Sequence, residues 1–220
     1  MNSQDIEVAP FSQLSATSWP DRNLRVFFQA EDLKIHEVCG TAACSGHAKW
    51  HTFNRSAIAP AARGCSMGIL NFQRSLRTSL RFYFESEPQM LREKCWEDGA
   101  WDATFGFYQL EIAREAAITA VSWGSLGTEN SDYEGLYMRV YILNGEGCVV
   151  EICWRYGWAE PKIIADDGLA GGKIAAVQRG SSDADLELRV YYSSRQKNVI
   201  NQLVFNEDGW KPHQGIELRN

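Results

Sequence analysis

The sequence of 220 residues lacks any long apolar run and any excess of positive charge. No stretch approaches about 18 consecutive apolar residues, so no membrane-spanning helix is predicted. The net charge is −6, which argues against nucleic acid as a partner, because phosphate binding depends on clustered Lys and Arg. The N-terminus, MNSQDIEVAPFSQLS, has neither a basic start nor an apolar core. It therefore predicts no secretion signal, and a protein that is cytoplasmic or released by an unconventional route.

Patterns that indicate metal or enzyme chemistry are also scarce. Neither H-E-x-x-H nor a P-loop occurs, no C-x-x-C pair exists among the six cysteines, and the four histidines are scattered. These absences argue against a zinc site and against common hydrolytic or phosphate chemistry. A glycosidase needs two carboxylates about 5–10 Å apart across the bond it cleaves, whereas each candidate site below has one. We predict a protein that is not an enzyme and uses no metal or cofactor.

What the sequence contains is a repeat. Four segments align, each opening with an apolar residue, an Arg, an apolar residue and an aromatic residue, and each resuming after a polar turn with a second strand-like run. They are LRVFFQAEDLKIHEVC from 24, LRFYFESEPQMLREKC from 80, MRVYILNGEGCVVEIC from 138 and LRVYYSSRQKNVINQLV from 188. Another strand-like run precedes each of them, such as ITAVSWG at 118–124. Apolar alternation and β-branched and aromatic residues predict strands here.

A period of about 50 residues with four strands per unit is typical of a β-propeller blade. We therefore predict an all-β fold, a β-propeller of about four blades made of four-stranded antiparallel sheets. The chain would form one domain, with blade repeats at approximately 13–66, 67–117, 118–172 and 173–220. No long helix is predicted, and 109–121 is read as loop plus strand. A β-sandwich of eight or more strands is the alternative, and the repeated polar residues described next make it less favoured.

Each repeat carries an Arg on one strand and a carboxylate or amide on the next. The Arg residues are Arg25, Arg81, Arg139 and Arg189. Glu37, Glu93 and Glu151 each follow their Arg by 12 residues, and Gln202 follows Arg189 by 13. A hairpin of that length places the two side chains on adjacent strands. They can brace the hairpin, but exposed ion pairs contribute only about 0–1 kcal/mol each. Four copies therefore favour a repeated polar binding site over a stability device.

Aromatic residues close the hairpins that carry the carboxylates. They are Trp96 and Trp101, Trp154 and Trp158, and Phe205 and Trp210. An Arg that donates, a Glu that accepts and an indole that offers a flat apolar face and an N–H together suit a sugar, with vicinal hydroxyls on the charged groups and C–H faces on the ring.

This pattern, clearest in LREKCWEDGAW (91–101) and in ITAVSWG…MRVY…VVEICW, resembles the fungal and bacterial fucose-specific lectins of the Aleuria aurantia type. The resemblance covers most of the chain. It implies metal-independent binding of L-fucose between adjacent blades, with Arg and Glu from one blade and two Trp positions from the next. The partners would be fucosylated glycans or glycoproteins.

Carried over residue by residue, the resemblance implies four sites. Site 1 combines Arg25 and Glu37 with Trp96 and Trp101, and site 2 combines Arg81 and Glu93 with Trp154 and Trp158. Site 3 combines Arg139 and Glu151 with Phe205 and Trp210, and it is expected to be weaker because Phe205 has no indole N–H. Site 4 has Arg189 and Gln202, and Gly40 stands where its first Trp would be. We expect two good sites, a weaker third, and a fourth that is altered or inactive.

Two questions stay open at this level. The resembling family closes a ring of six blades, so four blades can close alone, assemble with other copies into a homo-oligomer, or leave an open edge. The alternative function is a protein-interaction propeller in which the repeated Arg and Glu only brace the hairpins. A local disulfide between Cys39 and Cys44 is possible in an oxidising environment.

Overall fold

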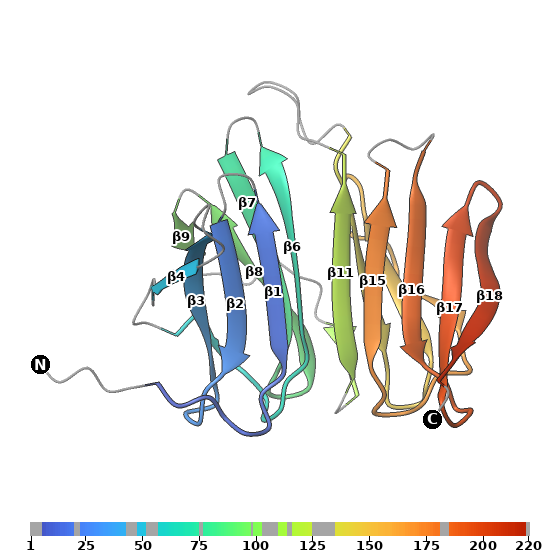
Figure 1. The fold of residues 1–220 in the computed structure, drawn as a ribbon, viewed down its shortest axis with the longest axis horizontal. Helices are drawn as coiled ribbons and strands as arrows, with labels where there is room; N and C mark the ends of the chain where they lie inside the picture. The colour runs from blue at the N-terminus through green and yellow to red at the C-terminus, as the bar shows by residue number, and fades with distance from the viewer. Residues whose placement is uncertain are drawn as a thin grey trace, which may run out of the picture.

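The computed structural model describes residues 6–19, 23–42, 48–51, 57–74, 77–97, 99–102, 110–113, 116–124, 135–180 and 185–218. Within these residues the chain is all-β, and its strands form four antiparallel sheets, called I to IV here, that follow one another along the chain (Figure 1). The prediction of an all-β fold of antiparallel sheets is confirmed. No helix in the described part is long and apolar enough to cross a membrane.

Sheets I and II come from the N-terminal half. Sheet I contains β1 (Leu14–Trp19), β2 (Asn23–Gln29), β3 (Lys34–Ala42) and β4 (Ala48–His51) in that order, with β5 (Ala59–Pro60) paired to β3. Sheet II contains β6 (Met67–Arg74), β7 (Arg77–Ser86), β8 (Met90–Glu97) and β10 (Leu110–Glu111) in that order, with β9 (Ala100–Trp101) paired to β8.

Sheets III and IV are simple four-stranded meanders. Sheet III contains β11 (Ala117–Trp123), β12 (Tyr137–Leu143), β13 (Val149–Trp154) and β14 (Lys162–Ala165). Sheet IV contains β15 (Ile174–Arg179), β16 (Glu187–Ser193), β17 (Val199–Asn206) and β18 (Gly209–Glu217).

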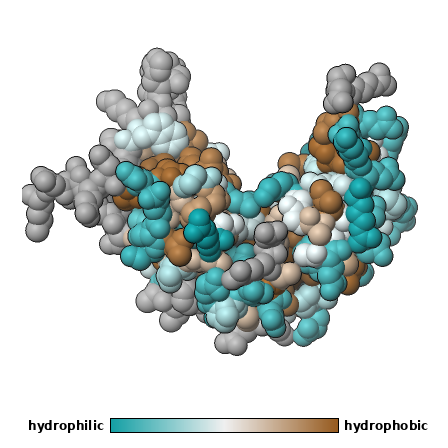
Figure 2. Space-filling view, turned by 90° about the horizontal axis from the view of Figure 1, so that it is seen from below, coloured by the Kyte–Doolittle hydropathy of each residue, from teal (hydrophilic) through white to brown (hydrophobic). Residues whose placement is uncertain are grey.

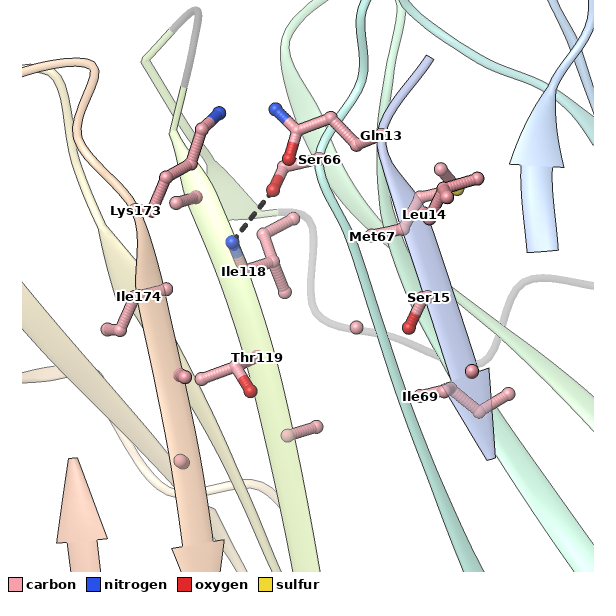
Figure 3. A pocket seen from close by; sticks show the side chains of 16 residues that line it. Gln13, Leu14, Ser15, Ser66, Met67, Ile69, Ile118, Thr119, Lys173 and Ile174 are labelled. Carbon is pink, nitrogen blue, oxygen red and sulfur yellow. Dashed lines mark hydrogen bonds between the residues drawn. The ribbon is translucent and has the colours of Figure 1, made fainter. Parts of the chain in front are cut away.

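The first strands of the four sheets lie side by side. Strand β6 contacts both β1 and β11, and β11 also contacts β15. A cavity of about 420 Å³ lies among these four strands, and Figure 3 shows that polar and apolar side chains both line it. Gly68 permits the close approach of β6 and β11, because a Cβ there would lie 3.2 Å from the Thr119 backbone. The first strands of the four sheets therefore lie next to one another, and the other strands of each sheet extend outward from them.

Alternation along each strand divides its side chains between two cores. On β12, Met138, Val140 and Ile142 pack against sheet II, whereas Tyr141 and Leu143 pack against sheet IV. Sheet II likewise sends Leu80, Phe82 and Phe84 towards sheet I and Tyr83 towards sheet III. Because Arg81 and Arg139 have the same strand parity as Tyr83 and Tyr141, they point into the junction with the following sheet. Arg189 lies on the corresponding face of sheet IV, beside Val177.

The two outermost sheets each have a face that no other sheet covers. Figure 2 shows a wide notch between the N-terminal and C-terminal arms of the molecule. Leu14 and Trp50 on the far side of sheet I, and Val177 on the far side of sheet IV, are each at least half exposed. The described residues thus form an open arrangement and no closed ring.

Candidate functional site

Site 1 lies at the junction of sheets I and II. Arg25 on β2 donates from Nη1 to Glu37 Oε2 on β3 at 2.8 Å, and both side chains are almost fully buried. Trp101 on β9 of sheet II donates from Nε1 to the other carboxylate oxygen, Glu37 Oε1, at 3.0 Å. One buried carboxylate therefore joins a cation of its own sheet to an indole of the next.

Two further indoles hold the Arg25 guanidinium. Its central carbon lies 4.3 Å from the Trp96 ring centroid and 5.3 Å from that of Trp19. The sequence reasoning did not single out Trp19, which ends the first strand of the repeat and is paired with Asn23. A cavity of about 490 Å³, lined in part by Trp19, Trp96 and Thr78, opens beside this clamp. Site 1 thus holds a buried cation between two indoles, beside a cavity that the same two indoles help to line.

Site 3, between sheets III and IV, repeats this geometry. Arg139 donates from Nη1 to Glu151 Oε1 at 2.6 Å, and Trp210 of sheet IV donates from Nε1 to the same oxygen at 3.1 Å. The Arg139 guanidinium lies 4.2 Å from the Phe205 ring centroid and 5.3 Å from that of Trp123. Phe205 thus takes the place of Trp96 as one wall of the clamp, and the second Trp position supplies the indole donor in both sites.

Site 2, between sheets II and III, has a different hydrogen-bond pattern. Arg81 donates from Nη2 to Glu97 Oε1 at 2.6 Å, and the predicted partner Glu93 accepts from the Tyr83 hydroxyl at 2.9 Å. Trp158 packs edge-on against Tyr83 with ring centroids 6.0 Å apart, as Trp101 does against Phe27. Burial raises the pKa of the Glu93 carboxyl to about 7, although the Tyr83 hydrogen bond and the Arg81 charge lower it.

Site 4 is the most altered. Arg189 donates to Glu187, two residues earlier on the same strand, and both side chains are more than a third exposed. Gln202 is buried, and its Nε2 has no hydrogen-bond partner among the described residues. The partner half of the site would come from sheet I, where Trp50 pairs with Gly40 across β3 and β4. Trp96 and Trp101 pair in the same way, so Trp50 occupies the second Trp position of sheet I.

The repeated cysteines lie beside the Arg–Glu pairs. Cys39 pairs across the strands with Arg25, Cys95 with Arg81 and Cys153 with Arg139. Burial raises the pKa of Cys39 and Cys153 to about 11 and that of Cys95 to about 12. These thiols therefore stay protonated near neutral pH and are poor nucleophiles. Cys39 is a free thiol, and Cys44, its suggested disulfide partner, lies outside the described residues.

One short motif in the chain matches the G-x-S-x-G of serine hydrolases, at Gly64–Gly68. In those enzymes the Ser sits on a sharp turn between a strand and a helix, with an exposed hydroxyl. Here Ser66 is buried and precedes strand β6, and its Oγ accepts a hydrogen bond from the Ile118 backbone N–H at 2.9 Å (Figure 3). Ser66 therefore ties sheet II to sheet III and does not have the setting of a nucleophile.

The family model for the fungal fucose-specific lectin matches residues 1–216. This chain belongs to that family. A fucose-specific lectin from Aspergillus fumigatus is 25% identical to this lectin-family chain in an alignment 215 residues long. The alignment covers 91% of this chain and 62% of the relative. The chain thus spans less than two thirds of that relative's length.

Solved structures place the lectin-family chain in the same fold. A crystal structure of AofleA from Arthrobotrys oligospora is 25% identical, with a TM-score of 0.78 over 97% of this chain and 59% of that one. The Aleuria aurantia lectin, described as a six-bladed β-propeller with a novel mode of fucose recognition, is 18% identical. Its TM-score is 0.81 over 98% of this chain and 67% of that one. The four sheets therefore share the fold of the matched part of these proteins.

Proposed function

We propose that this chain is a non-catalytic, metal-independent lectin that binds L-fucose and fucosylated glycans at the junctions between its sheets. The observation that carries the proposal is the repeated constellation of sites 1 and 3. In each, a buried carboxylate accepts from an Arg of its own sheet and from an indole of the next sheet. Membership of the fungal fucose-specific lectin family supports fucose as the sugar.

The chemistry of the constellation suits a deoxyhexose. A carboxylate accepts from two neighbouring hydroxyls, and a guanidinium donates to them with charge-assisted hydrogen bonds. The indole walls offer flat apolar surface to the C–H face of the ring and to a methyl group. Because the partners Arg25, Glu37 and Arg139 are already held in place, little side-chain order has to be acquired on binding.

The geometry favours a ranking of sites that differs from the sequence-based expectation. Sites 1 and 3 have the same pattern of hydrogen bonds, although Phe205 replaces an indole in site 3. Arg81 of site 2 and Arg189 of site 4 instead donate to Glu97 and Glu187. We therefore propose that sites 1 and 3 are the stronger ones. Several sites on one chain would allow binding to a cell surface with an avidity about 10²–10⁴-fold above single-site affinity.

Calorimetric titration tests the proposal. Purified protein titrated with L-fucose is expected to give saturable heat, undiminished by a chelator, that corresponds to at least two sites per chain. D-galactose, which differs in configuration and carries a 6-hydroxyl, serves as the control sugar and is expected to give none. Absence of heat with L-fucose would instead favour the bracing alternative, in which the Arg–Glu pairs only stabilise a protein-interaction surface.

We also propose that the four sheets are four blades of one propeller domain, divided as the repeats predict. The matched six-bladed lectin supports this reading of the fold. Apolar side chains on the uncovered faces, such as Leu14 on sheet I and Val177 on sheet IV, favour association between copies through these faces.

Light scattering checks the association. The protein is expected to elute with a mass above the 24.8 kDa of one chain, and Val177→Lys on the uncovered face of sheet IV is expected to lower that mass. Leu169→Lys is the matched control, since Leu169 is similarly exposed but lies outside the strands. A clean monomer for the wild-type protein would contradict association and leave the edge open in solution.

A further inference from the structure

The partner of the repeated Arg differs among the four repeats in a systematic way. In repeats I and III the Arg donates to the repeated Glu, as Arg25 does to Glu37 and Arg139 to Glu151. In repeats II and IV it donates to an additional carboxylate that the other two repeats lack, Glu97 or Glu187. The additional acid thus coincides with the altered site in both cases.

Glu97 occupies one defined position of the repeat. It directly follows Trp96 and has the same strand parity as Glu93 and Cys95, so it lies on the face that meets sheet III. We call the residue two places after the repeated Cys the rim residue. It is Thr41 after Cys39, Glu97 after Cys95 and Arg155 after Cys153. At this position of the sequence the residue is therefore neutral in repeat I, acidic in repeat II and basic in repeat III.

The charge of the rim residue correlates with the carboxylate to which the neighbouring repeated Arg donates. The Arg81–Glu97 pair is only partly accessible, with the two side chains 10% and 30% exposed, so its attraction is less screened than that of a fully exposed pair. In site 3 the rim residue Arg155 lies over the Tyr137 ring, 4.9 Å from its centroid, and as a cation it cannot accept from Arg139. Arg139 accordingly keeps its bond to Glu151.

The capture of Arg81 also changes the other half of site 2. Glu93 accepts from the Tyr83 hydroxyl, whereas the equivalent Tyr141 in site 3 has a buried hydroxyl without a partner among the described residues, and Glu151 is held by Arg139 and Trp210. In site 2 the cation and the repeated carboxylate are thus bonded to separate partners. In sites 1 and 3 they are bonded to each other and face a ligand as one unit.

We infer that Glu97 is a built-in competitor of the sugar at site 2: its carboxylate holds the Arg81 guanidinium away from Glu93, and the charge of the rim residue contributes to the relative affinity of sites 1, 2 and 3. This inference rests on the proposed fucose binding. Glu97 acts through Arg81 and is a positioning residue, so the test must read site 2 separately from sites 1 and 3.

The indole N–H resonances of ¹⁵N-labelled protein provide such a readout. Trp101, Trp158 and Trp210 report on sites 1, 2 and 3, and each signal among the eight tryptophans is assigned with a Trp→Phe variant. L-fucose is titrated into the wild-type protein, Glu97→Thr and Arg155→Glu. Thr is the natural rim residue of repeat I, and Glu111→Gln on the same sheet is the exposed control.

We expect Glu97→Thr to tighten the titration of Trp158 about three- to tenfold, with Trp101 and Trp210 unchanged. Arg155→Glu is expected to weaken the titration of Trp210 by a similar factor, because the introduced carboxylate would capture Arg139 as Glu97 captures Arg81. The inference is wrong, while the proposed function stands, if Trp101 and Trp210 respond to fucose but neither substitution changes the affinity read at its own site, by Trp158 for Glu97→Thr or by Trp210 for Arg155→Glu. If no indole responds in any variant, the proposed function itself fails.

Discussion

Replacing Glu37 by leucine is expected to lower the free energy of unfolding by about 3–5 kcal/mol and to abolish site 1. The carboxylate is 1% exposed and is paired with an Arg25 side chain that is 4% exposed. Removing it leaves a buried, uncompensated cation, which is among the most destabilising single changes in a protein interior. Urea unfolding measures the loss, and Glu31→Leu on the exposed β2–β3 turn is the matched control.

The double variant Arg25→Met/Glu37→Leu separates binding from bracing. Apolar side chains of similar size can replace a buried ion pair at little net cost, so most of the lost stability is expected to return. A residual loss of about 1 kcal/mol is expected because the Trp101 indole loses its acceptor. Fucose titration should still show one site fewer than in the wild-type protein. A double variant that binds with unchanged stoichiometry would show that the pair only braces the hairpin.

The repeat itself was sufficient to predict the all-β fold of antiparallel sheets and two of the Arg–Glu contacts. The constant spacing from Arg25 to Glu37 and from Arg139 to Glu151 indicates a hairpin with both side chains on one face, and the structure contains both hydrogen bonds. Trp101 reaches Glu37 from the next sheet. Such a contact between repeats follows from the resemblance to the lectin family, because spacing within one repeat carries no information about its neighbour.

Other features depend on which side chains lie close together in the folded protein, and the spacing of residues along the sequence does not encode this. Trp19 clamps Arg25 from the first strand of the repeat, and the same aromatic position, Trp123, recurs in repeat III, so a comparison of first strands could have found it. The choice of Arg81 between Glu93 and Glu97 was not predictable, since both carboxylates lie within reach of one side chain. Similarly, Trp50 pairs with Gly40 across ten residues of sequence, whereas Trp101 pairs with Trp96 across five, so the repeat spacing does not predict this pair.

The free energy of unfolding is expected to fall as pH rises towards 7 because of Glu93, and Glu93→Gln is expected to remove that fall. Burial raises the pKa of this carboxyl from 4.5 to about 7 in the folded protein. The folded state therefore keeps a proton that the unfolded chain has lost between these values. The stabilisation is fully present below about pH 4.5 and is lost as pH rises through about 7, a difference of about 3 kcal/mol.

The groups that face Glu93 determine how much of the pH dependence of stability comes from this carboxyl alone. Tyr83 donates to it, Arg81 and Cys95 lie on the same face of sheet II, and Trp158 of sheet III packs against Tyr83. Gln at this position retains an acceptor for the Tyr83 hydroxyl but carries no charge. Urea unfolding is measured at several pH values between about 4.5 and 7. As pH rises, the free energy of unfolding of Glu93→Gln should increase relative to that of the wild-type protein. The exposed control Glu111→Gln should run parallel to the wild type. If Glu93→Gln also runs parallel to the wild type, the expected rise in the pKa of the Glu93 carboxyl is wrong, and a nearby cation compensates its charge.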